Sequence, residues 1–308
     1  MIEMKISPPK LLAFFSILIN FGCISQVPSF SGESAFQYLE KQCSFGPRNP
    51  GSEGYELCKS FLIDELSKFS DSVFTQKFNQ LIPGTNHTME MTNIIGKLSG
   101  SGARPILLGA HWDTRPTADH DANPEKRDKP ILGANDGASG VAVLLEIARV
   151  LSQYPHDETV YIVFFDAEDL GIEGEHRSYA LGAQYFAKNL PISKPELAII
   201  LDMVGDANLE LPIERNSYYQ NPQLVKYLWN LADEIGLTAF EKNLGYEIYD
   251  DHVPLWENAN IPAIDIIDFN YPNRWSNFWH THDDVPENCS AESLNQVGTL
   301  LVHYIYDR

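Results

Sequence analysis

The chain of 308 residues is poor in cysteine, and this narrows the kinds of site that it can contain. Its four cysteines are Cys23, Cys43, Cys58 and Cys289, and no two of them form a Cys-x-x-Cys pair, which argues against zinc ligation by cysteine. Four thiols fit an oxidising compartment but do not make a disulfide-based scaffold. Cys43 and Cys58 lie on either side of the turn-rich residues 45–51, so they either pair as a disulfide or remain free thiols.

Basic residues and long apolar runs are also scarce. The chain has 22 Lys and Arg against 42 Asp and Glu, a formal charge of −20. Such an acidic protein repels phosphate backbones, so nucleic-acid binding is not expected. No stretch after residue 23 contains the roughly 20 apolar residues that a membrane-spanning helix needs. With 44% hydrophobic and 21% charged residues, the composition is that of a globular protein rather than a disordered one.

The first 22 residues have the features of an export signal. Lys5 and Lys10 precede the apolar residues 11–19, a run too short to cross a bilayer and typical of a bacterial signal peptide. We therefore expect an exported protein that is periplasmic, attached to the cell surface or secreted. Gly22-Cys23 resembles the end of a lipoprotein cleavage box, although Asn20 replaces the usual Leu. A lipid anchor on Cys23 and plain secretion both fit this sequence.

Beyond the signal, helical and strand patterns alternate along residues 32–308. Periodic apolar residues predict helices at 33–43, 54–69, 140–152, 181–190, 221–236 and 291–307, and short apolar runs predict strands at 92–98, 104–110, 158–165, 196–203 and 262–267. This alternation predicts a single α/β domain: a three-layer sandwich whose mixed, mostly parallel sheet has helices on both faces. Residues 114–130, rich in Pro, Asp and Lys, are expected to form a surface loop near the site.

Carboxylates and histidines stand where three of the predicted strands end and where the helix beginning near residue 137 opens. The residues concerned are His111, Asp136, Glu168, Asp169 and Asp202, with His280 further along the chain. In an open parallel sheet, ligands bind beyond the carboxyl ends of the strands, and His and carboxylate groups gathered there are what one zinc or a pair of zincs requires.

Each residue taken alone also has a structural interpretation. Asp136 or Asp202 would cap a helix or lie in a loop, and His111 would be a core histidine. Glu168 and Asp169, however, follow a buried apolar strand directly, where two carboxylates are costly without a cation. The coincidence of all six positions favours a metal site. Residues 282–284 (His-Asp-Asp) are expected at its rim rather than among the ligands.

These motifs carry a family resemblance. They are His-x-Asp at 111–113, Asn-Asp-Gly at 135–137, Asp-Ala-Glu-Asp at 166–169, Leu-Asp-Met at 201–203 and Trp-His-Thr-x-Asp-Asp at 279–284. In this order, the chain from about residue 36 to 308 resembles the zinc aminopeptidase and glutaminyl cyclase superfamily, metallopeptidase family twenty-eight. The resemblance implies a zinc exopeptidase-like fold and peptide N-termini as substrates.

The same resemblance implies a role for each residue. Asp136, Asp169 and His280 would bind the primary zinc, His111 and Asp202 would complete a second zinc site bridged by Asp136, Asp113 would orient His111, and Glu168 would be the general acid/base. One departure is Asp169, because many members of the family have Glu there. The shorter side chain is still expected to ligate, with the metal moved by about one methylene length.

Several segments resemble the bacterial glutaminyl-peptide cyclotransferase branch: residues 45–48, 111–116 and 250–255, and Trp279 before His280. This likeness implies that Asp250 joins Glu168 and Asp202 in a proton-sharing cluster and that Trp279 lines the pocket. The structural alternatives are a helix N-cap for Asp250 and core packing for Trp279.

The expected activity is conversion of N-terminal Gln to pyroglutamate with one zinc, in a monomeric enzyme. The alternative is a di-zinc aminopeptidase, since His111 and Asp202 are both present. A third hypothesis is a peptide-binding surface protein without activity, against which the intact Glu168 argues.

Overall fold

A mixed sheet of six strands forms the centre of the molecule. The computed structural model describes residues 1–2, 27–102 and 104–307, so residues 3–22 of the predicted signal peptide and Cys23 lie outside the described residues. The strand order is β1-β2-β4-β3-β5-β8. The bounds are β1 Ser72–Leu81, β2 Thr88–Leu98, β3 Ile106–His111, β4 Val160–Phe165, β5 Ala198–Asp202 and β8 Ala263–Ile267. Strands β4, β3, β5 and β8 are parallel, whereas β1 and β2 form an antiparallel edge, which confirms the mostly parallel sheet.

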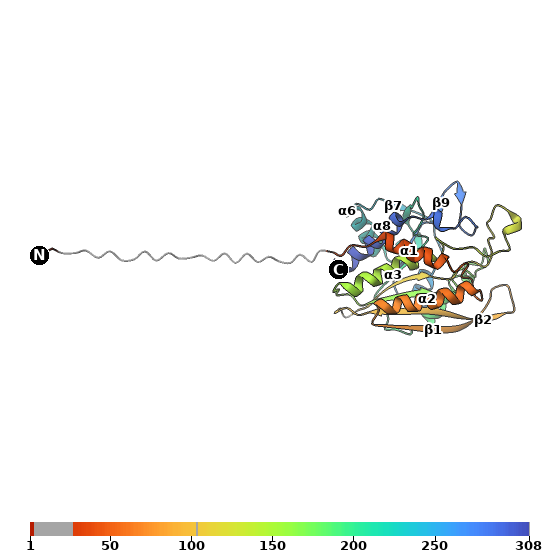
Figure 1. Ribbon diagram of the computed structural model, residues 1–308, viewed down its shortest axis with the longest axis horizontal. Helices are drawn as coiled ribbons and strands as arrows, with labels where there is room; N and C mark the ends of the chain where they lie inside the picture. The colour runs from red at the N-terminus through yellow and green to blue at the C-terminus, as the bar shows by residue number, and fades with distance from the viewer. Residues whose placement is uncertain (3–26, 103, 308) are drawn as a thin grey trace.

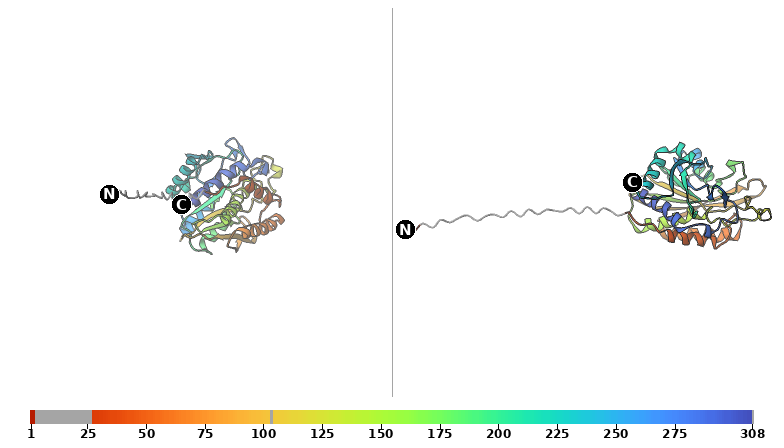
Figure 2. Two further views of the ribbon diagram at one scale, coloured as in Figure 1. Left: turned by 60° about the vertical axis from the view of Figure 1, so that its left-hand side comes forward. Right: turned by 90° about the horizontal axis from the view of Figure 1, so that it is seen from above.

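Helices cover both faces of this sheet, as the sequence predicts. On one face, the sheet contacts α2 Glu53–Phe69 and α3 Ala138–Gln153. Helices α1 Gly32–Cys43 and α8 Ala291–Tyr306 pack on α3, and α6 Pro222–Glu234 packs on α8. The other face packs against α4 Leu181–Lys188 and α7 His252–Ala259. Figure 1 shows α1, α2 and α3 in front of the sheet, and Figure 2 shows the same helices along one side of it. Each face of the sheet has its own hydrophobic core, and strand β3 contributes to both. Leu108 lies in the core on the first face and Leu107 in the core on the second.

The central strands are apolar throughout because both of their faces are covered. All six residues of β3 and all six of β4 are buried. Helix α3 lies unusually close to the sheet at Gly140, where a Cβ atom would stand 2.4 Å from the Leu201 carbonyl oxygen. This close approach brings the first turn of α3 next to the ends of β3 and β5.

The structure adds elements that the apolar pattern misses. Strand β1 is mostly exposed, so it lacks the apolar run by which strands are recognised. The other additions are short: β6 Leu211–Ile213, β7 Phe240–Leu244, β9 Pro272–Asn273, β10 Ser276–Asn277 and α5 Arg215–Gln220, three 3₁₀ turns at Pro124–Lys126, His176–Ser178 and Pro286–Asn288, and helix α7. Cys43, Cys58 and Cys289 are buried free thiols, so the structure holds the unpaired form of the first two.

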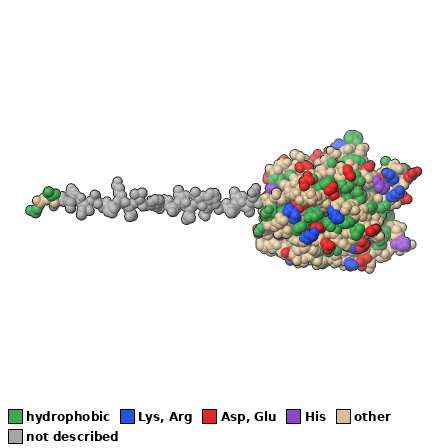
Figure 3. Space-filling view, in the orientation of Figure 1, with side chains coloured by type: hydrophobic (Ala, Val, Ile, Leu, Met, Phe, Trp, Pro, Cys, Tyr) green, Lys and Arg blue, Asp and Glu red, His purple; other side chains and the backbone are tan. Residues whose placement is uncertain are grey.

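The helices and the surface charge can be compared with the composition of the sequence. Within the described residues, none of the helices is long and apolar enough to cross a membrane. Acidic side chains are scattered over the face seen in Figure 3, and the basic side chains among them form no continuous patch on that face.

Candidate active site

The ends of the parallel strands bring the predicted residues together at one edge of the sheet. His111 is the last residue of β3, and Asp202 is the last residue of β5. Glu168 and Asp169 follow the end of β4 after two intervening residues. His111 pairs in register with Phe165, so β3 and β4 end at the same level.

Two groups of potential metal ligands form there and share one carboxylate. In the first, His280 Nε2 lies 3.0 Å from Asp169 Oδ1 and 3.7 Å from Asp136 Oδ2. In the second, His111 Nε2 lies 3.1 Å from Asp136 Oδ1 and 3.2 Å from Asp202 Oδ1. The two oxygens of Asp136 therefore face two different histidines.

These spacings fit zinc. Ligand atoms around a tetrahedral zinc, each about 2.0–2.1 Å from the metal, are about 3.3 Å apart, close to the separations in both groups. Asp136 Oδ2 and Asp169 Oδ2 are buried and have no hydrogen-bond donor. Burial, followed by the nearby charge of Asp136, raises the pKa of Asp169 to about 6. Unpartnered carboxylates packed this closely are stabilised by a bound cation.

Glu168, Asp202 and Asp250 lie beside these ligands and line one cavity of about 310 Å³. Burial raises the pKa of Glu168 well above its usual range, and Asp250 adds to this against the opposing effect of His111. Burial and then the charge of Asp202 raise the pKa of Asp250 to about 7. The three carboxyls are thus close enough to influence one another's protonation.

The two structural alternatives weighed for Asp250 and Trp279 do not describe their positions. The N-cap of α7 is Asp251, and both carboxylate oxygens of Asp250 are buried without a hydrogen-bond partner. The Trp279 ring is only partly buried, stacks on His280 with centroids 3.7 Å apart, and lines the same cavity.

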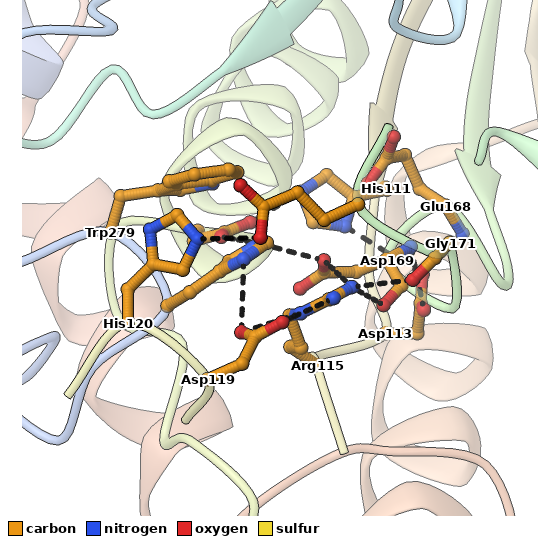
Figure 4. Close-up of polar contacts among 12 residues, drawn as sticks. His111, Asp113, Arg115, Asp119, His120, Glu168, Asp169, Gly171 and Trp279 are labelled. Carbon is orange, nitrogen blue, oxygen red and sulfur yellow. Dashed lines mark hydrogen bonds and ion pairs between the residues drawn. The ribbon is translucent and has the colours of Figure 1, made fainter. Parts of the chain in front are cut away.

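Asp113 connects the ends of β3 and β4. Its Oδ1 lies 3.6 Å from His111 Nδ1, and its carboxylate accepts hydrogen bonds from the backbone N–H groups of Glu168 and Asp169 at 3.0 and 3.3 Å. Figure 4 shows Asp113 beside this turn. One carboxylate thus fixes both a histidine ring and the backbone that carries two acidic side chains.

Asp284 differs from the expectation that it lies at the rim. It is fully buried and accepts hydrogen bonds from the backbone N–H groups of Asn135 and Asp136 and from the Tyr271 hydroxyl. That interpretation is wrong because the loop after β10 turns inward and places Asp284 beneath the Asp136 loop. His282 lies further out, with Nδ1 2.8 Å from Asp121.

Arg48 supports the same loop from below. Its buried guanidinium donates to the carbonyl oxygens of Trp112, Leu132 and Gly133. Residues 45–48 were singled out only by family likeness. In the structure, Arg48 connects the residue after β3 to the segment that leads into Asp136 through these hydrogen bonds.

Left-handed backbone is concentrated around the site. Ala167, Met203 and His280 have φ values of 58°, 47° and 58°, and they stand beside Glu168, beside Asp202 and at a potential ligand. Such conformations are costly for residues other than glycine and persist where the surrounding structure imposes them, commonly at functional sites.

Gly137, at the N-cap of α3, makes a testable contribution to the site. Its φ is 100°, and a Cβ atom there would stand 2.5 Å from the Asp113 carbonyl oxygen. We expect Gly137→Ala to lower the free energy of unfolding by about 3 kcal/mol or more, because it combines backbone strain with a steric clash. Urea unfolding would measure this. Gly236→Ala is the matched control, with φ of 81° and nothing within 4 Å of the added atom. Equal losses in the two variants would show that only the backbone angle matters.

Sequence reasoning missed several groups around the site. Asp265, in the middle of β8, lies with Asp250 and His252 in a further buried group of potential ligand atoms, and Asp251 is also fully buried. The sequence could have indicated Asp265, because it is an acidic residue inside the apolar run Ala263–Ile267, where a buried carboxylate is costly without a partner. Asp119 was expected only as a member of a nearby loop, and Arg115 only as part of that loop and of the segment 111–116 that resembles the cyclase branch.

A second hollow, of about 530 Å³, lies elsewhere. Its lining includes Lys68, Ser99, Gln153 and His156, and none of the residues in the two zinc-type groups. The potential zinc ligands therefore lie at the cavity of about 310 Å³ and not at this hollow.

Comparison with known proteins places this geometry in a family. The model of peptidase family M28 matches residues 93–305. Aminopeptidase YwaD of Bacillus subtilis is 30% identical over 237 residues, which are 72% of this chain but only 45% of that protein. The crystal structure of Bacteroides thetaiotaomicron glutaminyl cyclase bound to N-acetylhistamine is 35% identical with a TM-score of 0.87, covering 92% of this chain and 100% of that one.

The Porphyromonas gingivalis glutaminyl cyclase structure is 37% identical with a TM-score of 0.85, and the match covers 89% of this chain and 97% of that one. Both the sequence and the arrangement of the sheet are therefore shared over most of the described chain. The chain belongs to peptidase family M28 and is a zinc-dependent enzyme.

Proposed function

We propose that this enzyme converts the N-terminal Gln of peptides to pyroglutamate and releases ammonia. The observation that carries the proposal is the cluster of Glu168, Asp202 and Asp250 in one cavity next to the ligand group of His280. Cyclisation moves a proton from the attacking α-amine to the departing amide nitrogen without a water molecule. Mutually interacting carboxyls that share protons suit such a transfer within the site.

Asp136, Asp169 and His280 would hold one zinc in this mechanism. When bound, the zinc supplies Lewis-acid polarisation of the side-chain amide carbonyl. Asp113 and the turn after β4 keep Asp169 in place through the backbone hydrogen bond described above. The aromatic face of Trp279 offers the substrate an apolar wall at the cavity.

The chain's own carboxyls would move the protons. The substrate's α-amine attacks the Cδ carbon of the glutamine side chain, so a C–N bond forms within the substrate. Glu168 accepts a proton from the attacking nitrogen and returns one to the departing amide nitrogen as its C–N bond breaks. Asp202 and Asp250 would hold the tetrahedral species. Asp250 raises the proton affinity of Glu168, and Asp202 raises that of Asp250. The products are a pyroglutamyl peptide and ammonia, and no water is consumed.

A di-zinc aminopeptidase is the second candidate, favoured by a specific observation. The two oxygens of Asp136 face His280 and His111 separately, as a carboxylate bridging two metals would. His111 and Asp202 would then hold the second zinc. In this case Glu168 would take a proton from water, and the first peptide bond would be hydrolysed. The relative YwaD carries an aminopeptidase name.

One assay separates the candidates. Purified enzyme is incubated with a peptide that begins with Gln and with a matched peptide that begins with Leu, and mass and free ammonia are recorded. We expect the Gln peptide to lose one ammonia and the Leu peptide to remain intact. Release of the first residue from the Leu peptide would identify an aminopeptidase, and retention of both peptides unchanged would identify a binding protein.

Asp202→Asn tests the number of zincs. Asp202 lies 3.2 Å from His111, in the second ligand group only. For a one-zinc cyclase we expect the variant to keep its zinc while turnover falls by about a hundredfold, since a member of the proton-sharing cluster is lost. Zinc would be counted by mass spectrometry of the digested protein. Loss of one of two zincs would instead support the aminopeptidase.

The proposal extends to the rest of the chain. We infer that residues 1–22 are a signal peptide, that residues 32–308 form the catalytic domain, and that the enzyme acts outside the cytoplasm as a monomer. The sequence before residue 23 supports export, and Cys23 is the position where a lipid anchor would be attached.

A further inference from the structure

The potential ligand His280 has a second nitrogen that faces away from the metal group, and a carboxylate meets it. His280 Nδ1 lies 3.4 Å from Asp119 Oδ1, while Nε2 faces Asp169 and Asp136. We propose that Asp119, fixed by Arg115, is a positioning residue that sets the ring orientation and tautomer of His280 for zinc. The inference rests on the proposed ligand role of His280.

Arg115 holds Asp119 in a fixed direction. The guanidinium donates from Nε at 2.9 Å and from Nη2 at 2.6 Å to the Asp119 carboxylate. This pair is largely shielded from water, with 6% of the Arg115 side chain and 31% of the Asp119 side chain exposed. Two parallel hydrogen bonds to a guanidinium restrict a carboxylate more strongly than a single contact does.

The same guanidinium also reaches the other ligand segment. Arg115 Nη1 donates to the carbonyl oxygens of Asp169 and Gly171, and it lies 3.5 Å from Asp169 Oδ1. Figure 4 shows Arg115 between Asp119 on one side and Asp169 and Gly171 on the other. One buried cation thus links the turn that carries Asp169 to the residue that orients His280.

Among the described residues, Asp119 is the one acidic group within 4.0 Å of His280 Nδ1. The backbone of His280 is in the left-handed region, with φ of 58°, and Nδ1 has no partner that meets strict hydrogen-bond criteria. With the proton on Nδ1, the nitrogen that faces Asp119, the unprotonated nitrogen is Nε2, the one aimed at Asp169 and Asp136. Histidine ligands commonly gain basicity and a fixed orientation from such an outer carboxylate, and its removal typically weakens metal affinity about 10- to 100-fold.

The test is the zinc affinity of Asp119→Asn in the whole protein, measured by competition with a chromophoric chelator. We expect zinc to bind about 10- to 100-fold more weakly, with the full stoichiometry restored at high zinc. Asp119→Glu keeps the carboxylate and is expected to recover part of the lost affinity. Spectra of the cobalt-substituted protein should change in Asp119→Asn, because the geometry around the ion relaxes. Thermal unfolding of both variants checks that they are folded.

Asp121→Asn is the matched control. Asp121 lies in the same loop, and its carboxylate contacts the Nδ1 atom of His282, which belongs to none of the ligand groups among the described residues. Unchanged zinc affinity is expected in this variant. An equal loss in Asp121→Asn would show that loop disturbance is the cause and would overturn the positioning role, as would parental affinity in Asp119→Asn. If Asp119→Asn lost one zinc that high zinc concentrations did not restore, Asp119 would itself be a ligand, and the positioning role would also be overturned.

Failure of the proposed function gives a different pattern. If the enzyme hydrolyses peptides but Asp119→Asn weakens zinc as expected, the positioning role holds and the cyclase assignment fails. If His280→Ala binds zinc as tightly as the parent protein, the ligand assignment fails, and Asp119 has nothing to position.

Discussion

Replacing Glu168 with glutamine is expected to lower the turnover of N-terminal Gln peptides by about a hundredfold or more while zinc content stays the same. Proton transfer by a positioned base contributes roughly 10²- to 10⁴-fold to a rate, and a carboxamide cannot perform it. The variant keeps the size of the side chain in a site where Glu168 is nearly buried, so the fold is expected to be unaffected. Initial rates at saturating peptide, together with zinc analysis, measure the effect.

Glu173→Gln is the control for Glu168→Gln. Glu173 lines the same cavity but is exposed, and its carboxylate lies 3.7 Å from His120 Nε2. The turnover of Glu173→Gln is expected to remain within a factor of about two of the parent value, because an exposed charge contributes little energy. A Glu168→Gln enzyme as active as the parent would remove Glu168 from the mechanism, whereas equal losses in both variants would point to the charge of the cavity rather than to proton transfer.

Replacing Asp169 with alanine is expected to abolish tight zinc binding. The variant removes one of three converging ligands, and His280 Nε2 loses its partner at 3.0 Å. A ligand present at a thousand times its Kd stabilises the folded state by about 4.1 kcal/mol, so added zinc should raise the Tm of the parent protein but not that of the variant. Thermal unfolding with and without zinc after chelation, with metal analysis, gives the measurement.

Asp233→Ala serves as the control, because Asp233 is an exposed carboxylate that pairs with Lys242 and belongs to none of the ligand groups among the described residues. Its zinc content and its response to zinc should equal those of the parent. Stoichiometric, tightly bound zinc in Asp169→Ala would overturn the first ligand group. That result would indicate that zinc binds to the group of His111, Asp136 and Asp202 instead.

The strongly apolar elements were the ones that the sequence located well. Helix α3 was expected at 140–152 and lies at Ala138–Gln153, and strand β4 was expected at 158–165 and lies at Val160–Phe165. Both are buried over most of their length, and burial of this kind leaves a continuous apolar signal. Strand β1 has nine partly or fully exposed positions around its buried Phe78, and its place in the sheet comes from pairing with β2 rather than from its own side chains.

The order of ligand types along the chain was also a property of the sequence. His111, Asp136, Asp169, Asp202 and His280 could be selected because strand ends and short motifs mark them. Parallel strands place their carboxyl ends at one edge, so the selection of these residues already implied their convergence. The roles of the individual residues rest on chemistry that the experiments above would test.

Asp119 and Asp284 illustrate what only the tertiary structure decided. Each is an acidic residue in an irregular segment, where sequence reasoning has no period to follow and a solvated loop is the ordinary expectation. Their positions depend on contacts with residues distant in the chain: Asp284 with the backbone of Asn135, and Asp119 with the ring of His280. By itself, the sequence determined the class of fold, the acidic character and the set of potential ligands. The support that orients those ligands was decided by folding, because hydrogen bonds between distant loops have no local signature.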